Sequence, residues 1–250
     1  MKTVLITGAT SGIGQATARK LAQNFKLILC GRRQSRLDSL KAELSAITKV
    51  HTLNFDVCNK QQVFEQINSL PADFRAVHIL INNAGNAHGL AAFQDADMED
   101  LEKMIDGNVK GIIYVSKAVL PLMIAQGSGH IVNISSTAGK EVYANGATYC
   151  ASKFAVEALS KGMRIDLLPL GIKVSNVAPG MVETEFSLVR FKGDEQRAGK
   201  VYAGFTPLSA QDIAETIFFA IMQPEHVQLA DITIMPKAQA AAGHVLKNNA

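Results

Sequence analysis

The stretch TVLITGATSGIG at residues 3–14 places a short aliphatic and β-branched run directly before a glycine-rich loop. Glycine lets the backbone turn tightly and approach a ligand closely. A helical run follows at residues 15–23, and the free N–H groups and positive dipole end of its first turn favour a phosphate. The stretch predicts a strand, a turn and a helix that bind a pyrophosphate. The spacing is G-x-x-x-G-x-G rather than the more common G-x-G-x-x-G, and a simple strand-to-helix turn is the alternative.

Further aliphatic runs recur along the chain and alternate with amphipathic helical stretches, such as the one that repeats Leu37, Leu40 and Leu44. Several runs are apolar on both faces, which is typical of a parallel sheet covered by helices on each side. We predict an α/β fold with a doubly wound, mainly parallel sheet of seven strands and right-handed crossovers. No linker divides the chain, so residues 1–250 are expected to form one domain. The predicted strands are 3–7, 26–30, 50–54, 78–82, 130–134, 173–177 and 228–234.

The composition of the 250 residues, 48% hydrophobic and 19% charged, supplies ample apolar material for a core. A formal net charge of +3 is too small to favour nucleic acid. The three cysteines form no C-x-x-C pair, and the six histidines show no metal-ligand spacing. No uninterrupted apolar run approaches the ~18 residues of a membrane span. We therefore expect a cytoplasmic protein, in a reduced compartment, that binds no metal, nucleic acid or membrane.

Two arginines follow the second predicted strand. In dinucleotide-binding sites, an acidic residue about 20 residues beyond the glycines holds the ribose 2′-hydroxyl of NAD. Arg32 and Arg33 stand there instead, and guanidinium groups suit the 2′-phosphate of NADP. The alternative is that Arg32, Arg33 and Arg36 are only the solvated start of a helix, although cations there oppose the helix dipole. The charge therefore predicts NADP(H) as the cofactor.

Tyr149 and Lys153 lie four residues apart in a helical run at residues 147–168. Residues at this spacing share a helix face, so the ammonium is expected beside the phenol and lowers its pKa. Lowering that pKa from about 10 toward 7 needs roughly 4 kcal/mol, more than one lysine supplies, so we expect a nicotinamide cation to add the rest. Ser135 and Ser136 follow the strand at residues 130–134, at the sheet edge where ligands bind in open α/β sheets.

These motifs occur in a characteristic order: TGATSGIG at 7–14, NNAG at 82–85, Asn108, Ser136, YCASK at 149–153, and PG at 179–180. The chain resembles the short-chain dehydrogenase/reductase family essentially from end to end. The resemblance implies a single-domain Rossmann fold. It also implies hydride transfer between NADP(H) and a small-molecule alcohol or carbonyl substrate.

The resemblance also implies residue roles. Tyr149 corresponds to the general acid/base, Lys153 to its partner and ribose anchor, and Ser136 to the group that holds the substrate oxygen. Asn108 corresponds to the residue that orders a helix backbone and a water in a proton relay toward Lys153. Asn82 either lines the site or ties neighbouring strands. The implied cofactor-binding residues are Gly8, Ser11, Gly12, Ile13, Gly14, Arg32, Arg33, Asp56, Val57, Asn83, Ala84, Gly85, Tyr149, Lys153, Pro179, Gly180, Val182 and Thr184.

Residues 181–206 contain no predicted strand and mix polar with aromatic side chains, so we expect a substrate lid. The stretch VETEFSLVRFKGD at 182–194 is similar to the lid of NADP-dependent 3-hydroxy acid dehydrogenases, which oxidise L-serine, L-allo-threonine and 3-hydroxyisobutyrate. This chain differs by a shortened stretch just after Val182. Phe186 and Arg190 are the candidate substrate contacts, with Arg190 as a carboxylate clamp. The alternative for Arg190 is a salt bridge from the lid to the body of the protein.

Two other functions are compatible with these motifs. One is a broader carbonyl or 3-oxoacyl reductase of the same family, and the other is a catalytically silent NADP sensor. A sensor has no need of Ser136, Tyr149 and Lys153 together. The resemblance also implies a homotetramer built through the helices that carry Asn108 and Tyr149. Apolar residues there exceed what one helix face needs, or all belong to the core: Ile112, Ile113, Val119 and Leu122.

Overall fold

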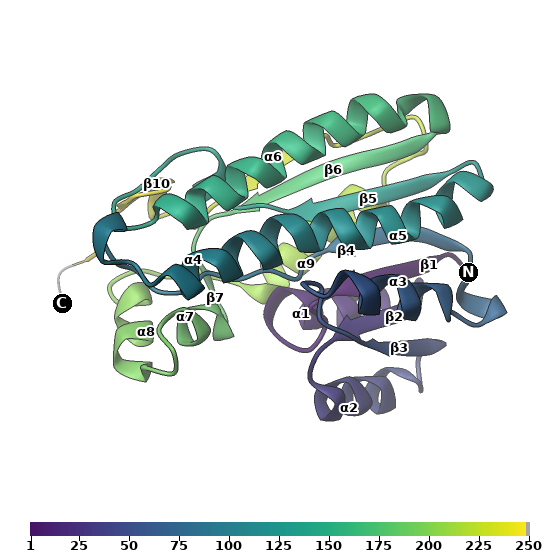
Figure 1. Ribbon diagram of the computed structural model, residues 1–250, viewed down its shortest axis with the longest axis horizontal. Helices are drawn as coiled ribbons and strands as arrows, with labels where there is room; N and C mark the ends of the chain where they lie inside the picture. The colour runs from purple at the N-terminus through teal and green to yellow at the C-terminus, as the bar shows by residue number, and fades with distance from the viewer. Residues whose placement is uncertain (249–250) are drawn as a thin grey trace.

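The computed structural model describes residues 1–248, and a seven-stranded sheet forms its centre (Figure 1). The strand order is β3-β2-β1-β4-β5-β6-β9, and every pair is parallel. The predicted Rossmann-type fold is therefore confirmed. The strands are β1 Thr3–Thr7, β2 Lys26–Gly31, β3 Val50–Asn54, β4 Val77–Asn82, β5 Gly129–Ile134, β6 Ile172–Pro179 and β9 Asp231–Ile234.

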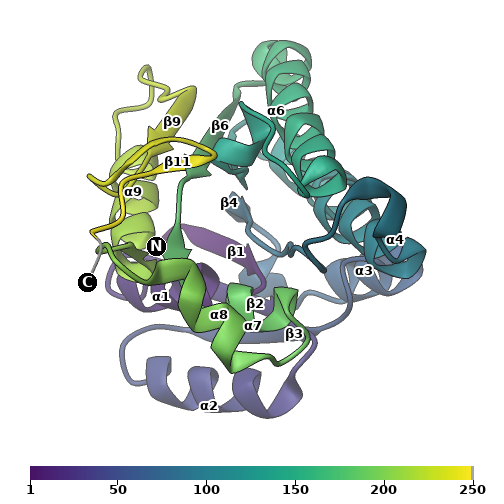
Figure 2. The same ribbon diagram turned by 90° about the vertical axis from the view of Figure 1, so that its left-hand side faces the viewer.

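Helices cover both faces of the sheet because the strands bury alternate side chains on opposite sides. Val4 and Ile6 of β1 pack in a cluster with residues of α1 (Gly12–Leu21), α2 (Gln34–Leu44) and α9 (Ala210–Ile221). Leu5, between them, packs on the other face with residues of α3 (Lys60–Asn68), α5 (Gly111–Ala125) and α6 (Ala147–Leu167). Figure 2 shows the sheet between these two layers.

One continuous helical stretch, Met98–Ala125, joins α4 (Met98–Ile105), a π-helical turn (Asp106–Lys110) and α5. Among the described residues 1–248, it alone is long and apolar enough to cross a membrane by length and composition, and 44% of its most apolar window is buried. Val115, Val119 and Met123 pack in the core cluster beside the sheet. Core packing therefore accounts for its apolar composition.

The segment at residues 181–206 has more regular structure than its sequence predicted. Two short helices, α7 (Glu185–Arg190) and α8 (Glu195–Tyr202), follow a two-residue strand, β7 (Val182–Glu183), which pairs with β8 (Leu208–Ser209). A two-residue strand lacks the alternating pattern from which strands are recognised, which explains why it was missed. The strand predicted at 228–234 is shorter and begins at Asp231. Near the C-terminus, β10 (Gln239–Ala241) pairs with β11 (His244–Val245).

Because all seven strands are parallel, their carboxyl ends meet at one edge of the sheet. In Figure 1 this edge lies on the left, where α7, α8 and β10 gather around it. The chain order reverses between β1 and β4, the switch point at which open α/β sheets bind ligands. The fold thus positions the site at this edge.

Candidate active site

A cavity of about 950 Å³ lies at the carboxyl edge of the sheet. It brings together the glycine-rich loop, the end of β2, the strand ends of β4 to β6, and the segment around α7. All predicted site residues line it except Gly14 and Asn108, which lie just behind the wall. The predicted residues that line the cavity are Gly8, Ser11, Gly12, Ile13, Arg32, Arg33, Asp56, Val57, Asn83, Ala84, Gly85, Ser136, Tyr149, Lys153, Pro179, Gly180, Val182, Thr184, Phe186 and Arg190.

The glycine-rich loop forms a cradle that side chains would block. Gly8 and Gly12 have positive φ values of +66° and +50°. A Cβ added at Gly14 would lie 2.3 Å from the carbonyl oxygen of Gly8, so the first turn of α1 packs directly on the loop. Asn83 Nδ2 holds the loop from the next strand by donating to the carbonyl oxygen of Thr7 at 2.9 Å.

The start of α1 suits an anion. Ser11 precedes the helix, and its hydroxyl does not cap any helix N–H. The first turn holds no acidic side chain. Its N–H groups and dipole therefore face the cavity uncompensated, as phosphate binding at a helix N-terminus requires. These features fit the pyrophosphate of a dinucleotide.

The arginines at the end of β2 take two different environments. Arg32 pairs with Asp56 at 3.1 Å and stays largely exposed. Partial burial alone would raise the pKa of Asp56. The Cys58 N–H and the Arg32 guanidinium outweigh burial and hold that pKa below its usual range. Arg33 instead turns toward the glycine-rich loop, where its Nε donates to the Thr10 hydroxyl at 3.2 Å.

A carboxylate that the sequence did not predict lies among these arginines. Glu185, the first residue of α7, pairs with Arg33 at 2.9 Å and with Arg36 at 2.6 Å. Arg36 therefore also belongs to this cluster, whereas the sequence placed it only on a solvated helix start. Nothing in the sequence signals Glu185, because 149 and 152 residues separate it from Arg36 and Arg33.

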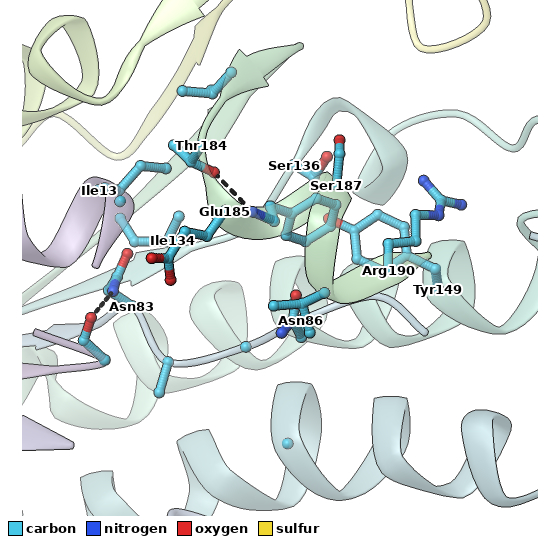
Figure 3. A pocket seen from close by; sticks show the side chains of 18 of the residues that line it. Ile13, Asn83, Asn86, Ile134, Ser136, Tyr149, Thr184, Glu185, Ser187 and Arg190 are labelled. Carbon is cyan, nitrogen blue, oxygen red and sulfur yellow. Dashed lines mark hydrogen bonds between the residues drawn. The ribbon is translucent and has the colours of Figure 1, made fainter. Parts of the chain in front are cut away.

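Tyr149 and Lys153 lie on one face of α6, as their spacing predicts, and both are buried, with 8% and 6% of their surface exposed. The Lys153 ammonium donates to the carbonyl oxygen of Ile134 at 3.0 Å and lies 5.9 Å from the centre of the Tyr149 ring. The Ser136 side chain lines the same cavity as the Tyr149 phenol and accepts the N–H of Ala138 at 3.1 Å. Figure 3 shows Ser136, Tyr149 and Arg190 around the same pocket.

Burial decides the protonation of this pair. It raises the pKa of Tyr149 above its usual range, with a smaller contribution from Tyr143, while Ser136 and the Arg190 cation act in the opposite direction. Burial lowers the pKa of Lys153 to about 8, against the opposing carboxylate of Glu157. The spacing alone predicted a lowered pKa for the phenol. That prediction was wrong for the protein without cofactor, because desolvation of the phenolate outweighs a lysine whose ammonium turns toward a carbonyl oxygen.

Asn108 lies in the π-helical turn between α4 and α5, and its side chain orders the backbone around it. Its Nδ2 donates to the carbonyl oxygen of Asn86 at 2.8 Å and to the Ser152 hydroxyl at 2.9 Å. Its Oδ1 accepts the N–H of Asn86 at 2.7 Å. A Cβ on Gly85 would lie 2.7 Å from the same Oδ1 and 3.8 Å from the Lys153 ammonium, so only glycine fits there. Asn108 therefore connects the β4 loop to α6.

Asn82 does not line the cavity. Its Nδ2 donates to the Ser116 hydroxyl and to Asn133 Oδ1, both at 2.9 Å. These bonds tie β4 to β5 and α5. Of the two sequence-based interpretations of Asn82, the structure supports the strand-tying one.

Arg190 lies at the end of α7 with its guanidinium beside two tyrosines. The guanidinium carbon is 5.7 Å from the centre of the Tyr149 ring and 5.8 Å from that of Tyr143. Nε donates to the carbonyl oxygen of Gly89 at 3.0 Å, and one Nη donates to the Tyr143 hydroxyl at 3.3 Å. Within residues 1–248, Arg190 forms no salt bridge with an acidic side chain. The lid-to-body salt bridge is therefore not made, and this cation shares the cavity with the phenol of Tyr149.

Comparisons with known proteins agree with this site. The short chain dehydrogenase family matches residues 2–194. The NADP-dependent 3-hydroxy acid dehydrogenase of Salmonella typhi is 45% identical over 242 residues, covering 96% of this chain and 97% of that protein. Sulfoacetaldehyde reductase 2 of Chromohalobacter salexigens is 46% identical over 239 residues, covering 95% of each. The closed form of a serine dehydrogenase complexed with NADP+ superimposes with a TM-score of 0.92 at 41% identity, covering 99% of this chain and 100% of that one.

The chain belongs to the short-chain dehydrogenase family. It is an NADP-dependent oxidoreductase that acts on CH–OH groups of small molecules, and NADP(H) is its cofactor. When bound, this cofactor supplies the hydride acceptor or donor. The glycine cradle, the uncapped start of α1 and the arginine cluster fit its pyrophosphate and 2′-phosphate.

Proposed function

We propose that the protein interconverts a small 3-hydroxy acid and its oxo acid, with substrates of the L-serine, L-allo-threonine or 3-hydroxyisobutyrate type. The observation that carries this proposal is the Arg190 guanidinium, a cation without an acidic partner among residues 1–248, 5.7 Å from the centre of the Tyr149 ring. A substrate with a carboxylate close to its hydroxyl would place the anion on Arg190 and the hydroxyl on Tyr149. The similarity to 3-hydroxy acid and serine dehydrogenases supports this substrate class.

The residues that would carry the chemistry are Tyr149, Lys153, Ser136 and Asn108. Tyr149 takes the proton of the substrate hydroxyl while hydride leaves the same carbon, and in the reverse direction it gives that proton to the carbonyl oxygen. The Ser136 hydroxyl holds the substrate oxygen. Lys153, buried as an ammonium below its pKa of about 8, stabilises the phenolate and anchors the ribose. Asn108 orders the backbone for a water relay toward Lys153.

The cofactor's 2′-phosphate would lie at Arg32 and Arg33, where two guanidiniums border the cavity. Residues 181–206 would act as the substrate lid, since Phe186 and Arg190 reach the cavity from α7. Phe186 contributes an apolar wall by packing edge-on against Tyr149, with ring centres 5.8 Å apart. An apolar wall beside the Arg190 cation suits a small anion.

A second candidate substrate is a small aldehyde that carries a sulfonate, supported by the 46% identical sulfoacetaldehyde reductase. A sulfonate presents the same charge to Arg190 as a carboxylate does. The broader carbonyl or 3-oxoacyl reductase has weaker support, because its larger neutral substrates would not use this cation. The silent sensor has the least support, because Ser136, Tyr149 and Lys153 all border the cavity.

A substrate panel tests the proposal. Steady-state kinetics with NADP(H) would compare L-serine, 3-hydroxyisobutyrate and sulfoacetaldehyde with a neutral alcohol and an acetoacetyl thioester. In Arg190→Leu we expect kcat/KM for the anionic substrates to fall about 10- to 100-fold, the cost of a charge-assisted hydrogen-bond pair, with little change for the neutral alcohol. Arg197→Leu is the matched control, because Arg197 does not line the cavity and its guanidinium stacks on Phe191 of the cavity wall. Equal losses for charged and neutral substrates would exclude the clamp.

We also propose that the protein forms a homotetramer. Of the four residues considered from the sequence, Ile112 and Val119 are buried in the core, whereas Ile113 is exposed. Phe154 and Ile165 of α6 are exposed as well. These side chains give α5 and α6 an apolar outer surface, and light scattering would show a mass four times that of the chain.

A further inference from the structure

The segment at residues 184–193 spans the mouth of the cavity and contacts both of its walls. At one end, Glu185 reaches Arg33 and Arg36 at the start of α2, and a Cβ added to Gly12 would lie 3.3 Å from Thr184. The start of α7 therefore covers the glycine-rich loop. In Figure 3, Thr184 and Glu185 lie to the right of Ile13 of that loop.

The opposite end of the segment is held by a backbone hydrogen bond and an ion pair. The N–H of Gly89 donates to the carbonyl oxygen of Arg190 at 2.9 Å. Lys192 pairs at 2.9 Å with Asp100, whose side chain is 10% exposed. These contacts tie the segment to the β4 loop and α4, so α7 bridges the cavity between two anchors.

The anchor at Glu185 differs from the other because it uses the cofactor arginines. One Glu185 oxygen accepts from Arg33 and the other from Arg36, so a single carboxylate joins two guanidiniums. Partial burial alone would raise the pKa of Glu185. Hydrogen bonds from Arg36 and Arg33 outweigh burial and hold that pKa below its usual range. Thr10 completes the cluster by accepting from Arg33 at 3.1 Å. Glu185 is thus ionised at neutral pH, and the cluster joins three segments of the chain: the glycine-rich loop, the start of α2 and the start of α7.

We propose that Glu185 is a positioning residue that latches the 184–193 segment closed onto Arg33 and Arg36, so that closure over the substrate depends on the arginines of the 2′-phosphate site. This inference rests on the proposed 2′-phosphate site. Closing the segment brings Arg190, which lies on α7, to Tyr149, which lies across the cavity on α6. A latch that opens more often lowers the fraction of protein competent to bind substrate, and the apparent substrate affinity falls by that fraction.

The cofactor should respond in the opposite way. Glu185 is an anion that pairs with guanidiniums, and these guanidiniums would also bind the 2′-phosphate of the cofactor. Replacing it by glutamine removes the repulsion of the phosphate and leaves the arginines in place. A residue with a merely structural role would weaken cofactor and substrate together, whereas a latch weakens substrate alone.

Limited trypsin digestion of the cofactor-free protein tests the latch directly, because Arg190 and Lys192 lie within the segment. In Glu185→Gln we expect cleavage after these residues to accelerate about three- to tenfold, the effect of two partly exposed ion pairs. Glu183→Gln is the matched control, since Glu183 is exposed and forms no salt bridge within residues 1–248. Arg33→Gln and the double variant complete a cycle, in which the two changes should not add.

Binding and kinetics supply the second readout. In Glu185→Gln, the KM for 3-hydroxyisobutyrate should rise by about the same three- to tenfold with kcat nearly unchanged. The Kd of NADPH, measured by calorimetry, should stay within about twofold or decrease. Unchanged cleavage in Glu185→Gln, or a loss of NADPH affinity as large as the rise in KM, would overturn the latch. If Arg33→Gln left NADPH affinity intact, the 2′-phosphate site would fail, while the cleavage comparison would still decide the latch.

Discussion

The two ends of the cavity hold their ionisable groups in different ways. At the Tyr149 end, ionisable groups are buried and held by neutral partners, such as the Ile134 carbonyl that accepts from Lys153. At the Arg33 end, they are partly exposed and held by opposite charges, with 40% of the Arg33 side chain and 38% of the Glu185 side chain accessible. Burial shifts pKa values strongly at the first end, whereas water screens the ion pairs at the second.

This difference fits the two tasks proposed for the cavity. Burial raises the pKa of Tyr149 and lowers that of Lys153, and because little water screens this end, a cation bound beside the phenol would change its pKa strongly. A phosphate that must bind and leave needs accessible cations that exchange partners, and exposed guanidiniums meet that need. Substitutions at the buried end should therefore reduce activity far more than substitutions at the exposed end.

The largest effect is expected for Tyr149→Phe. This change removes the phenolic proton and leaves the ring in its packing against Phe186. Turnover should fall by about 10²- to 10⁴-fold, the usual contribution of general acid/base catalysis, with the Kd of NADPH unchanged. Single-turnover kinetics measure this loss. A decrease of less than about tenfold would assign the proton to another group.

The next effect concerns stability at the buried end. Folding lowers the pKa of Lys153 from 10.5 to about 8, a shift equivalent to roughly 3 kcal/mol. The unfolded chain binds the extra proton between these pH values, so this group raises stability as pH increases from about 8 to 10.5 and costs most below pH 8.

Lys153→Met should therefore stabilise the protein at pH 7 by about 2 kcal/mol, after about 1 kcal/mol is subtracted for the lost bond to Ile134. The same change should abolish activity. Denaturant unfolding at pH 7 and pH 10 measures the difference, which should shrink at the higher pH. A variant less stable than the wild type at pH 7 would show that burial does not strain this lysine.

A smaller effect is expected at the exposed end. Arg33→Gln should raise the Kd of NADPH by about tenfold, the loss of one charge-assisted contact, and leave the weak binding of NADH unchanged. Added salt should reduce the difference between variant and wild type, because these charges are partly exposed. Calorimetric titrations at low and high salt provide the measurement. Equal losses for NADPH and NADH would place the 2′-phosphate elsewhere.

The sequence predicted the buried end more completely than the exposed end. Motifs such as the helical spacing of Tyr149 and Lys153 are local, so their geometry follows from the helix itself. The Glu185 pairs join α7 to α2 across about 150 residues, and no local pattern predicts such a contact. The direction of the Tyr149 pKa shift was also wrong, because burial depends on the whole fold rather than on neighbours along the helix.

The central claim is that burial keeps Tyr149 protonated until the nicotinamide cation of NADP+ joins Lys153 beside it. NMR of the protein labelled at tyrosine Cζ, with Tyr149→Phe to assign the signal, reports the ionisation of this one phenol. We predict that Tyr149 stays protonated above the usual tyrosine range in the free protein, and that saturating NADP+ lowers its pKa by about two units or more. The same pKa with and without NADP+ would contradict the account.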